Sequence, residues 1–386
     1  MSEASGQATS ELELLPTAEE NDLRDAVASL LSRRCEVDAV RAMYDGDDAA
    51  VAPLWKSVAA ELGLAGLLVG ESEGGVGGSA REAAVVLTEL GRSVAPVPFL
   101  TSAVLASTVL TAAVEAGTAT EAAGFLLADL AAGDRTAALL VPLTAGPGSA
   151  AAGGLAAARV EGEPCTVRSV AGVLEADVLL VPIATPDGLA VRAVAVTDAR
   201  VEPVVSLDMT RPLADVTVAP RDGAPVLVEA GGGAAAIDRA LLVGAGLLAA
   251  EQAGVAAWCL TETVSYLKDR RQFGRVVGGF QALKHRLADL YVSVESASAA
   301  AAYAAAGLAA GDADAEVGVH LAAAYCSDVA VTAAEEAVQL HGGIGMTWEH
   351  PAHLYLKRAK ADQLALGSPG AHRARIAELV DLPAPS

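Results

Sequence analysis

Two segments of the sequence carry residue types that can bind an anionic ligand. The first, YLKDRRQFGRVVGGFQ from Tyr266 to Gln281, has a basic cluster at the end of a predicted helix, then a glycine turn and a new helix from Phe280. The second, AVQLHGGIGMTWEHP from Ala337 to Pro351, closes an apolar helix on two glycines. Guanidinium groups offer forked donors to phosphate oxygens, and glycine permits close backbone approach. Both segments therefore suit a phosphate-bearing ligand.

Other patterns have simpler explanations. Gly244, Gly246 and Ala249 have the G-x-G-x-x-A spacing of a dinucleotide fold, but the preceding residues continue a helical pattern, which favours helix packing through small residues. His350 and His353 are three apart, yet Pro351 lies between them and no acidic third ligand stands at a helical offset. We expect a helix start there and no metal.

Composition narrows the classes of function. The net charge of -22 would repel a phosphate backbone over most of the surface, so nucleic acid is an unexpected partner. No run reaches the ~18 apolar residues of a membrane helix. The first residues are acidic and lack a signal pattern, and the four cysteines show no CxxC spacing. We expect a cytoplasmic protein without a membrane anchor or disulfide framework.

The periodicity of apolar residues divides the chain into parts that must position these segments. Residues 1–20 are expected to form a disordered acidic tail, and 21–135 show the i, i+3, i+4 pattern of helices. Short β-branched runs between Gly, Pro and Asp turns fill 136–230. Long helical repeats return in 231–386, which suits a four-helix bundle. The fold class is mainly α with a central β domain.

At these residues the chain resembles the acyl-CoA dehydrogenase family. The C-terminal pattern of that family is similar to two motifs of this chain, R-x-Q-F-G-x-x-x-x-x-F-Q and, after it, Q-L-H-G-G-x-G. The N-terminal helix and loop of the family resemble the segment PLWKSVAAELGLAGLLVGESEGGVGGS. The resemblance implies a middle β-barrel or sandwich and FAD bound at a subunit boundary. The residues that it implies as FAD contacts are Arg270, Gln272, Phe273, Gln281, Gln339, Gly342 and Gly343.

The resemblance also implies a reaction, the α,β-dehydrogenation of an acyl-CoA thioester with an acceptor such as an electron-transfer flavoprotein. A carboxylate must remove the α proton. The usual position follows the helix with R-x-A-K and is Leu366 here, while the alternative position on the long preceding helix is Gly244. Glu251 is the best remaining candidate for the base, ahead of Asp238 and Asp362.

Two further departures keep alternatives open. Where the family has flavin-ring loops, this chain has TAGPGSAAAGG and PCTVRSVAG, with no tryptophan. One hypothesis is an enzyme with a displaced base, acting on bulky or branched acyl groups as a homotetramer or dimer. A second is a non-catalytic or half-site subunit of a heterotetramer with another acyl-CoA dehydrogenase. A third is a related flavoenzyme of secondary metabolism.

Overall fold

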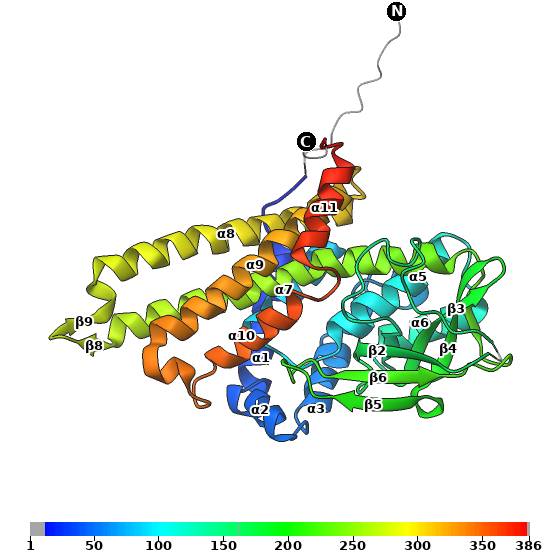
Figure 1. Ribbon diagram of the computed structural model, residues 1–386, viewed down its shortest axis with the longest axis horizontal. Helices are drawn as coiled ribbons and strands as arrows, with labels where there is room; N and C mark the ends of the chain where they lie inside the picture. The colour runs from blue at the N-terminus through cyan, green and yellow to red at the C-terminus, as the bar shows by residue number, and fades with distance from the viewer. Residues whose placement is uncertain (1–11, 161, 384–386) are drawn as a thin grey trace, which may run out of the picture.

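The computed structural model describes residues 12–160 and 162–383, which form a helical part, a β part and a second helical part in that order (Figure 1). Of the predicted tail, residues 1–11 lie outside the described range. Helix α1 already begins at Ala18, because Thr17 Oγ1 accepts a hydrogen bond of 3.1 Å from Glu20 N and Thr17 N donates to the Glu20 carboxylate at 2.8 Å. This capping box satisfies backbone donors at the helix end, so the chain is ordered earlier than residue 21.

The first helical part surrounds a core formed by the apolar faces of its helices. In α4, Ala83, Val86, Leu87 and Leu90 are buried at the spacing of one helix face. Its helices are α1 (Ala18–Arg34), α2 (Val37–Ala42), α3 (Val51–Lys56), α4 (Ala80–Arg92), α5 (Ser107–Glu115) and α6 (Glu121–Ala132). Two π-helical segments, η2 (Ser57–Glu61) and η5 (Phe99–Ala106), join them, together with the 3-10 turns η1 (Met43–Asp45), η3 (Leu64–Gly66) and η4 (Glu71–Glu73).

The β part consists of two sheets. The first has the order β1 (Ala137–Leu139), β3 (Val178–Thr185), β4 (Gly188–Ala195) and β7 (Val226–Val228), and the second has β2 (Cys165–Ala171), β6 (Leu213–Val218) and β5 (Arg200–Val204). Strands β1 and β3 are parallel, and the other pairs are antiparallel.

Strand β3 is buried on both faces. Leu179, Val181 and Ile183 belong to the apolar core that the second sheet shares, whereas Val178 and Leu180 belong to the core of the helices. Successive side chains of a strand point to opposite faces, so one strand serves both cores. The β part is therefore a sandwich whose first sheet also packs against helices.

The second helical part is built on three long helices, α7 (Gly233–Asp269), α8 (Gln281–Ala310) and α9 (Ala315–His341), with the shorter α10 (Ala352–Asp362) and α11 (Pro369–Leu379). The short hairpin β8 (Arg271–Gln272) and β9 (Arg275–Val276) joins α7 to α8, and the 3-10 turns η7 (Val277–Gly279) and η8 (Gly342–Met346) follow β9 and α9. Figure 1 shows this hairpin at the end of the long helices opposite the β part.

Two helical segments are long and apolar enough to cross a membrane by length and composition, 233–269 and 315–346. Of the most apolar window in each, 89% and 72% is buried inside the protein. Their apolar surface is therefore used for packing in the bundle.

Small residues let α4 and α7 cross at close range. A Cβ atom on Gly91 would overlap Glu251 O, and one on Gly254 would overlap Thr88 O. Any side chain at these two positions would therefore push the backbone of the facing helix away. Gly244 and Gly246 also lie within α7, so their spacing reflects helix packing and not a dinucleotide-binding turn.

Candidate functional site

The two positions where a catalytic carboxylate was sought lie side by side. A Cβ atom on Gly244 would be 3.1 Å from Leu366 Cδ1 and 2.5 Å from Leu105 Cδ2. Leu366 is only 1% exposed and Leu105 6%, so the space between α7, η5 and the 366 loop is filled by leucine side chains. Neither position carries a group that can accept a proton.

The loop with Leu366 also contacts the β part through the main chain. Leu366 N donates to Leu143 O at 2.8 Å, and a Cβ atom on Gly146 would lie 3.2 Å from Gly367 Cα. Leu366 itself has a φ of 54°, a left-handed conformation that costs energy for a residue with a side chain. These contacts bring the two loops together where the family resemblance places the reacting groups.

The two segments that replace the usual flavin-ring loops are neighbours. Leu143 N donates to Ser169 O at 3.0 Å, which joins the residue just before the first segment to the second segment. Asp238 accepts hydrogen bonds from Ala150 N at 2.9 Å and Ala151 N at 2.8 Å, so this carboxylate fixes the first loop. Both segments are thus held against one another and, through Leu143, against the loop with Leu366.

Glu251 lies about 10 Å, or two helical turns, from Gly244 along α7. It is 1% exposed and bound by two arginines. Arg211 Nη2 lies 2.7 Å from both carboxylate oxygens, and Arg358 Nη1 lies 2.5 Å from Oε1. Burial raises the pKa of Glu251, but the charges of Arg211 and Arg358 outweigh burial and hold the pKa below its usual value.

The same arginines bind two further carboxylates. Arg358 Nε donates to Asp208 Oδ2 at 2.5 Å, and Arg211 Nη1 pairs with Asp362 Oδ1. Burial, opposed by Arg211 and reinforced by Glu251, raises the pKa of Asp362 to about 7. Two guanidinium groups thus face three buried carboxyl groups, and repulsion from Glu251 and Asp208 adds to the raised pKa of Asp362. We call these five side chains the arginine network.

The arginine network gives Glu251 a structural role. A base must have a free oxygen near the α proton of the substrate, and both oxygens of Glu251 are held in ion pairs. Catalysis by Glu251 stays a prediction from the sequence, and its contacts argue against it. Asp238 is likewise engaged, with loop amides, whereas Asp362 pairs with Arg211 through Oδ1 and its buried Oδ2 has no hydrogen-bond partner among the described residues.

The first group of predicted cofactor contacts lies on and beside the hairpin β8–β9. Phe273 and Gly274 form its turn with φ of 51° and 71°, and Phe273 is 88% exposed. Arg270 ends α7 in an extended conformation, and its O accepts from Val277 N at 2.8 Å, which fixes the base of the hairpin. Arg270, Gln272 and Gln281 are also exposed. Among the described residues Phe273 makes one aromatic contact, edge-on with Phe280 at a centroid distance of 6.2 Å, which leaves most of the ring open.

The second group lies at the end of α9. Gln339, Gly342 and Gly343 line a pocket of about 240 Å³ together with Glu335, Val338, Met346 and Leu356. A Cβ atom on Gly342 or Gly343 would meet no atom within 4 Å, so a ligand can approach the backbone closely here, although Gly342 N itself donates to Gln339 O. The hairpin residues are not among the lining of this pocket. Within one chain the two groups therefore form two separate open surfaces.

Both surfaces fit the adenosine and pyrophosphate half of FAD in chemical type. Exposed guanidinium groups suit phosphate oxygens, and exposed amide side chains and glycine backbone suit the polar edges of an adenine. The hairpin side also carries Lys268, Arg271 and Arg275. Positive charge is thus concentrated here in a protein with a net charge of -22.

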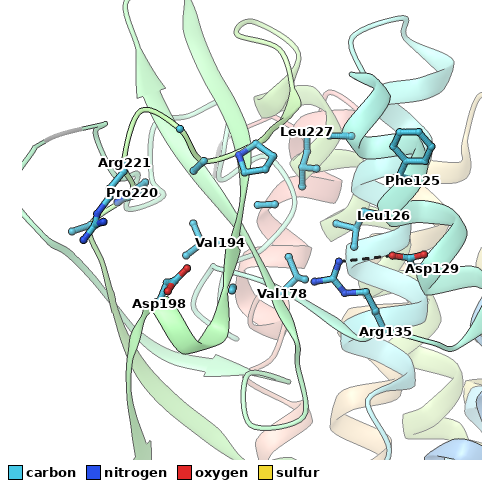
Figure 2. A pocket seen from close by; sticks show the side chains of 17 residues that line it. Phe125, Leu126, Asp129, Arg135, Val178, Val194, Asp198, Pro220, Arg221 and Leu227 are labelled. Atoms are coloured by element: carbon cyan, nitrogen blue, oxygen red, sulfur yellow. Dashed lines mark ion pairs between the residues drawn. The ribbon is translucent and has the colours of Figure 1, made fainter.

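A larger pocket lies elsewhere. A space of about 920 Å³ lies between α6 and the strands of the β part, and Arg135 in its lining pairs with Asp129 at 3.8 Å. Figure 2 shows Phe125 and this ion pair on the side of α6. None of the predicted site residues lines it. Its size alone does not make it the site of the chemistry discussed above.

Two sequence profiles identify the family to which this fold belongs. The profile described as "Acyl-CoA dehydrogenase, N-terminal domain" matches residues 17–134, and the one described as "Acyl-CoA dehydrogenase, C-terminal domain" matches residues 231–380. Together they cover well over half of the chain. This chain belongs to the acyl-CoA dehydrogenase family, whose members are oxidoreductases acting on CH–CH groups with FAD as cofactor.

Particular relatives are similar over nearly the whole length. Acyl-CoA dehydrogenase IpdE2 of Mycobacterium tuberculosis is 35% identical over 356 residues, which cover 92% of this chain and 95% of that protein. The ChsE4-ChsE5 complex from Mycobacterium tuberculosis matches with a TM-score of 0.81 at 27% identity, over 97% of this chain and 100% of that one. A variant of the Tcur3481-Tcur3483 steroid ACAD matches with a TM-score of 0.78 at 27% identity, over 94% and 98%.

Sequence reasoning missed most of the arginine network. Arg358 directly precedes Ala359 and Lys360 in KRAK, and Arg211 follows Asp208 and Thr210 in SLDMTRP. Arg358 Nη2 donates to Thr210 Oγ1 at 2.6 Å, so this short polar run in the β part meets α10. The sequence signal that could have predicted this network is an acidic, a hydroxyl and a basic side chain within four consecutive residues. Its partners in α7 and α10 are distant in sequence.

Proposed function

We propose that this chain is a half-site subunit of a heteromeric, FAD-dependent acyl-CoA dehydrogenase. It supplies the adenosine-binding hairpin and glycine turn to a flavin whose ring and catalytic base lie in a homologous partner chain. Bound FAD supplies the two-electron oxidant for the α,β-dehydrogenation of an acyl-CoA. The observation that carries the proposal is the direct contact of Leu366 with Leu143 and with the Gly244 position.

The packing around Leu105 and Leu366 supports the proposal that the partner chain binds the flavin ring. An enzyme that acts alone needs space for a flavin ring and an acyl chain beside a carboxylate. Here the corresponding space holds Leu105 and Leu366, and the nearest buried carboxylate on α7, Glu251, is bound by two arginines. The remaining role in the family reaction is to bind and orient the cofactor.

The exposed hairpin supports a partner. Phe273 is 88% exposed at a left-handed position, and its edge-on contact with Phe280 covers little of the ring. A ligand or a second subunit that covers Phe273 would explain its retention, since aromatic residues are enriched at interface centres. Arg270, Gln272 and Gln281 would then meet the pyrophosphate and adenosine from the same side.

The names of similar proteins support both a heteromer and a bulky substrate. Two of the solved structures reported above are complexes of two differently named chains, and one is called a steroid ACAD. We therefore propose that this chain is part of a heterotetramer and that the complex acts on a ring-bearing or branched acyl-CoA. We also propose an acceptor such as an electron-transfer flavoprotein and a cytoplasmic location.

The experiment is expression of the chain alone and together with a homologous acyl-CoA dehydrogenase encoded beside it. We expect the chain alone to hold little FAD and the pair to form a yellow complex with one FAD for each pair of unlike chains. Absorbance spectra and size determination measure both. A yellow homo-oligomer of this chain whose flavin is bleached by an acyl-CoA would refute the half-site role and favour the self-sufficient enzyme.

A matched pair of arginine variants tests whether the hairpin binds the FAD pyrophosphate. In the complex, Arg270→Gln should weaken FAD binding roughly 10- to 100-fold, because a charge-assisted hydrogen bond contributes about 1.5–3 kcal/mol. Arg271→Gln, one residue away and equally charged, is the control for a general loss of positive charge. Equal weakening by both variants would show that only the summed charge matters and that Arg270 holds no specific place.

A further inference from the structure

Three side chains from distant parts of the sequence meet near the end of α9. Glu262 lies on α7, His341 is the last residue of α9, and His350 precedes α10. Each offers one ligand atom, and these atoms all lie within 4.8 Å of one another. The rings of His341 and His350 have centroids 4.2 Å apart.

One ring nitrogen of His341 lacks a hydrogen-bond partner among the described residues. His341 is 3% exposed, and its Nδ1 lies 2.7 Å from Ala337 O, so Nδ1 carries the proton and donates it. Its Nε2 is then a lone-pair acceptor, buried and unpaired among the described residues. An unsatisfied buried polar atom costs about 1–3 kcal/mol, and its retention calls for an explanation.

The surroundings of His341 are those of a metal ligand. Metal-bound histidines commonly donate their second nitrogen to a backbone carbonyl, which fixes the tautomer and the direction of the free nitrogen. The Tyr266 ring packs against His341 with centroids 4.4 Å apart and restricts rotation of the imidazole. His350 Nδ1 accepts only a long hydrogen bond of 3.2 Å from Ala352 N, so that ring can turn either nitrogen to an ion at little cost.

We propose that Glu262, His341 and His350 bind a divalent transition-metal ion of the Zn²⁺ type. Two imidazole nitrogens and one carboxylate oxygen are common Zn²⁺ ligands, and a tetrahedral ion has a fourth position for water. Soft thiolates are not part of the cluster, and a Ca²⁺ or Mg²⁺ site would be built from oxygens. The ion would join α7, the end of α9 and the segment before α10.

The site would hold the glycine turn in place. His341 directly precedes Gly342 and Gly343, whose open backbone lines the 240 Å³ pocket. An ion bound to His341 would anchor this turn to α7 through Glu262. The inference concerns ion binding by this chain and stands or falls independently of the half-site role.

In the sequence, the conspicuous neighbour of His350 is His353 and not His341. His353 is three residues away, but its Nε2 lies 3.3 Å from Trp348 O and its ring packs edge-on against Trp348. It is not one of the three clustered residues. His353 therefore provides a matched control for a local loss of imidazole.

The test uses the full chain, without a histidine tag and treated with a chelator, or its purified complex. Calorimetric titration with ZnCl₂ should show one ion per chain, and Co²⁺ should give the intense visible absorption of a tetrahedral site. His350→Gln and Glu262→Gln should each weaken Zn²⁺ binding by at least about 100-fold, since loss of even an outer-shell partner costs 10- to 100-fold. His353→Gln should bind as the unchanged protein does.

Three results would overturn the site. They are no saturable binding of Zn²⁺, binding that survives both His350→Gln and Glu262→Gln, or equal weakening by His353→Gln, which would indicate adventitious surface chelation. Circular dichroism of each variant separates loss of a ligand from loss of the fold. Zn²⁺ should also raise the Tm of the unchanged protein and not that of Glu262→Gln, because a ligand that binds only the folded state stabilises it.

Discussion

At the scale of single residues, the arginine network explains why a carboxylate can stay ionised in the interior of this protein. Two guanidinium groups in nearly full burial need anions, and Glu251 bridges both of them. Asp208 adds a second anion, whereas burial raises the pKa of Asp362. The network ties α7 and α10 to the β part, so it fixes the relative positions of three elements.

Removal of one anion from this network should be costly. Glu251→Gln leaves a buried guanidinium without its counter-charge, and we expect a loss of about 3–5 kcal/mol in the free energy of unfolding. Urea denaturation measures it. The exposed Glu295→Gln is the control and should stay within about 0.5 kcal/mol. Unchanged stability with lost turnover in the reconstituted enzyme would instead mark Glu251 as the base.

At the scale of elements, α11 is attached to the bundle through a pair of buried histidines. His320 Nδ1 on α9 and His372 Nδ1 on α11 are 2.8 Å apart, so one must donate and the other accept. Protonation of both would set two donors against each other. Burial and the neighbouring imidazole lower the pKa of His372 to about 4, and burial lowers the pKa of His320. His372 also lies against Gly367, next to Leu366.

This pair predicts a loss of stability in acid. The folded pKa of His372 is below the unfolded value of about 6.5, so the unfolded chain binds more protons between these values. The stabilising effect is complete above pH 6.5 and declines as the pH falls towards 4. His320→Gln combined with His372→Gln should show a smaller drop in Tm over that window. A drop equal to that of the unchanged protein would assign the acid sensitivity to carboxylates instead.

Sequence patterns predict elements well where the information is local. The apolar run of β3 and the helical spacing in α4 come from neighbouring residues, and the order of the three parts follows from them. The contact between Leu143 and Leu366 could not be predicted, because it joins a β loop to the C-terminal helices. The same holds for Glu262 and His341. Such meetings depend on how whole elements pack, which no local pattern records.

At the scale of the whole molecule, charge and exposed surface point to assembly. A chain with a net charge of -22 keeps four exposed basic residues close to Phe273, namely Lys268, Arg270, Arg271 and Arg275. A partner or cofactor of negative charge would be attracted to this end and repelled from the rest of the surface. The hairpin would thus both attract a negatively charged partner or cofactor and bind it.

Two exposed phenylalanines allow a matched test of that role. In the co-expressed complex, Phe273→Ala should weaken association or FAD retention by about 30-fold, as expected for loss of about 2 kcal/mol at an interface centre. Phe125→Ala, in the α6 pocket of Figure 2 and 67% exposed, should change neither. Size-exclusion chromatography and flavin absorbance provide the measurements. Identical behaviour of the two variants would remove the hairpin from the interface.

The direct contact between Leu143 and Leu366 also has a consequence for sequence evolution, because it affects which substitutions this chain can tolerate. Once a chain has lost its own proton-accepting group, random drift is free to exchange one apolar packing for another around Leu105, Leu366 and Gly244. Under the proposed half-site role the hairpin has no such freedom, because the turnover of the partner chain would depend on it. We therefore expect orthologues of this chain to vary at Leu366 and to co-evolve, at Arg270 and Phe273, with a neighbouring gene.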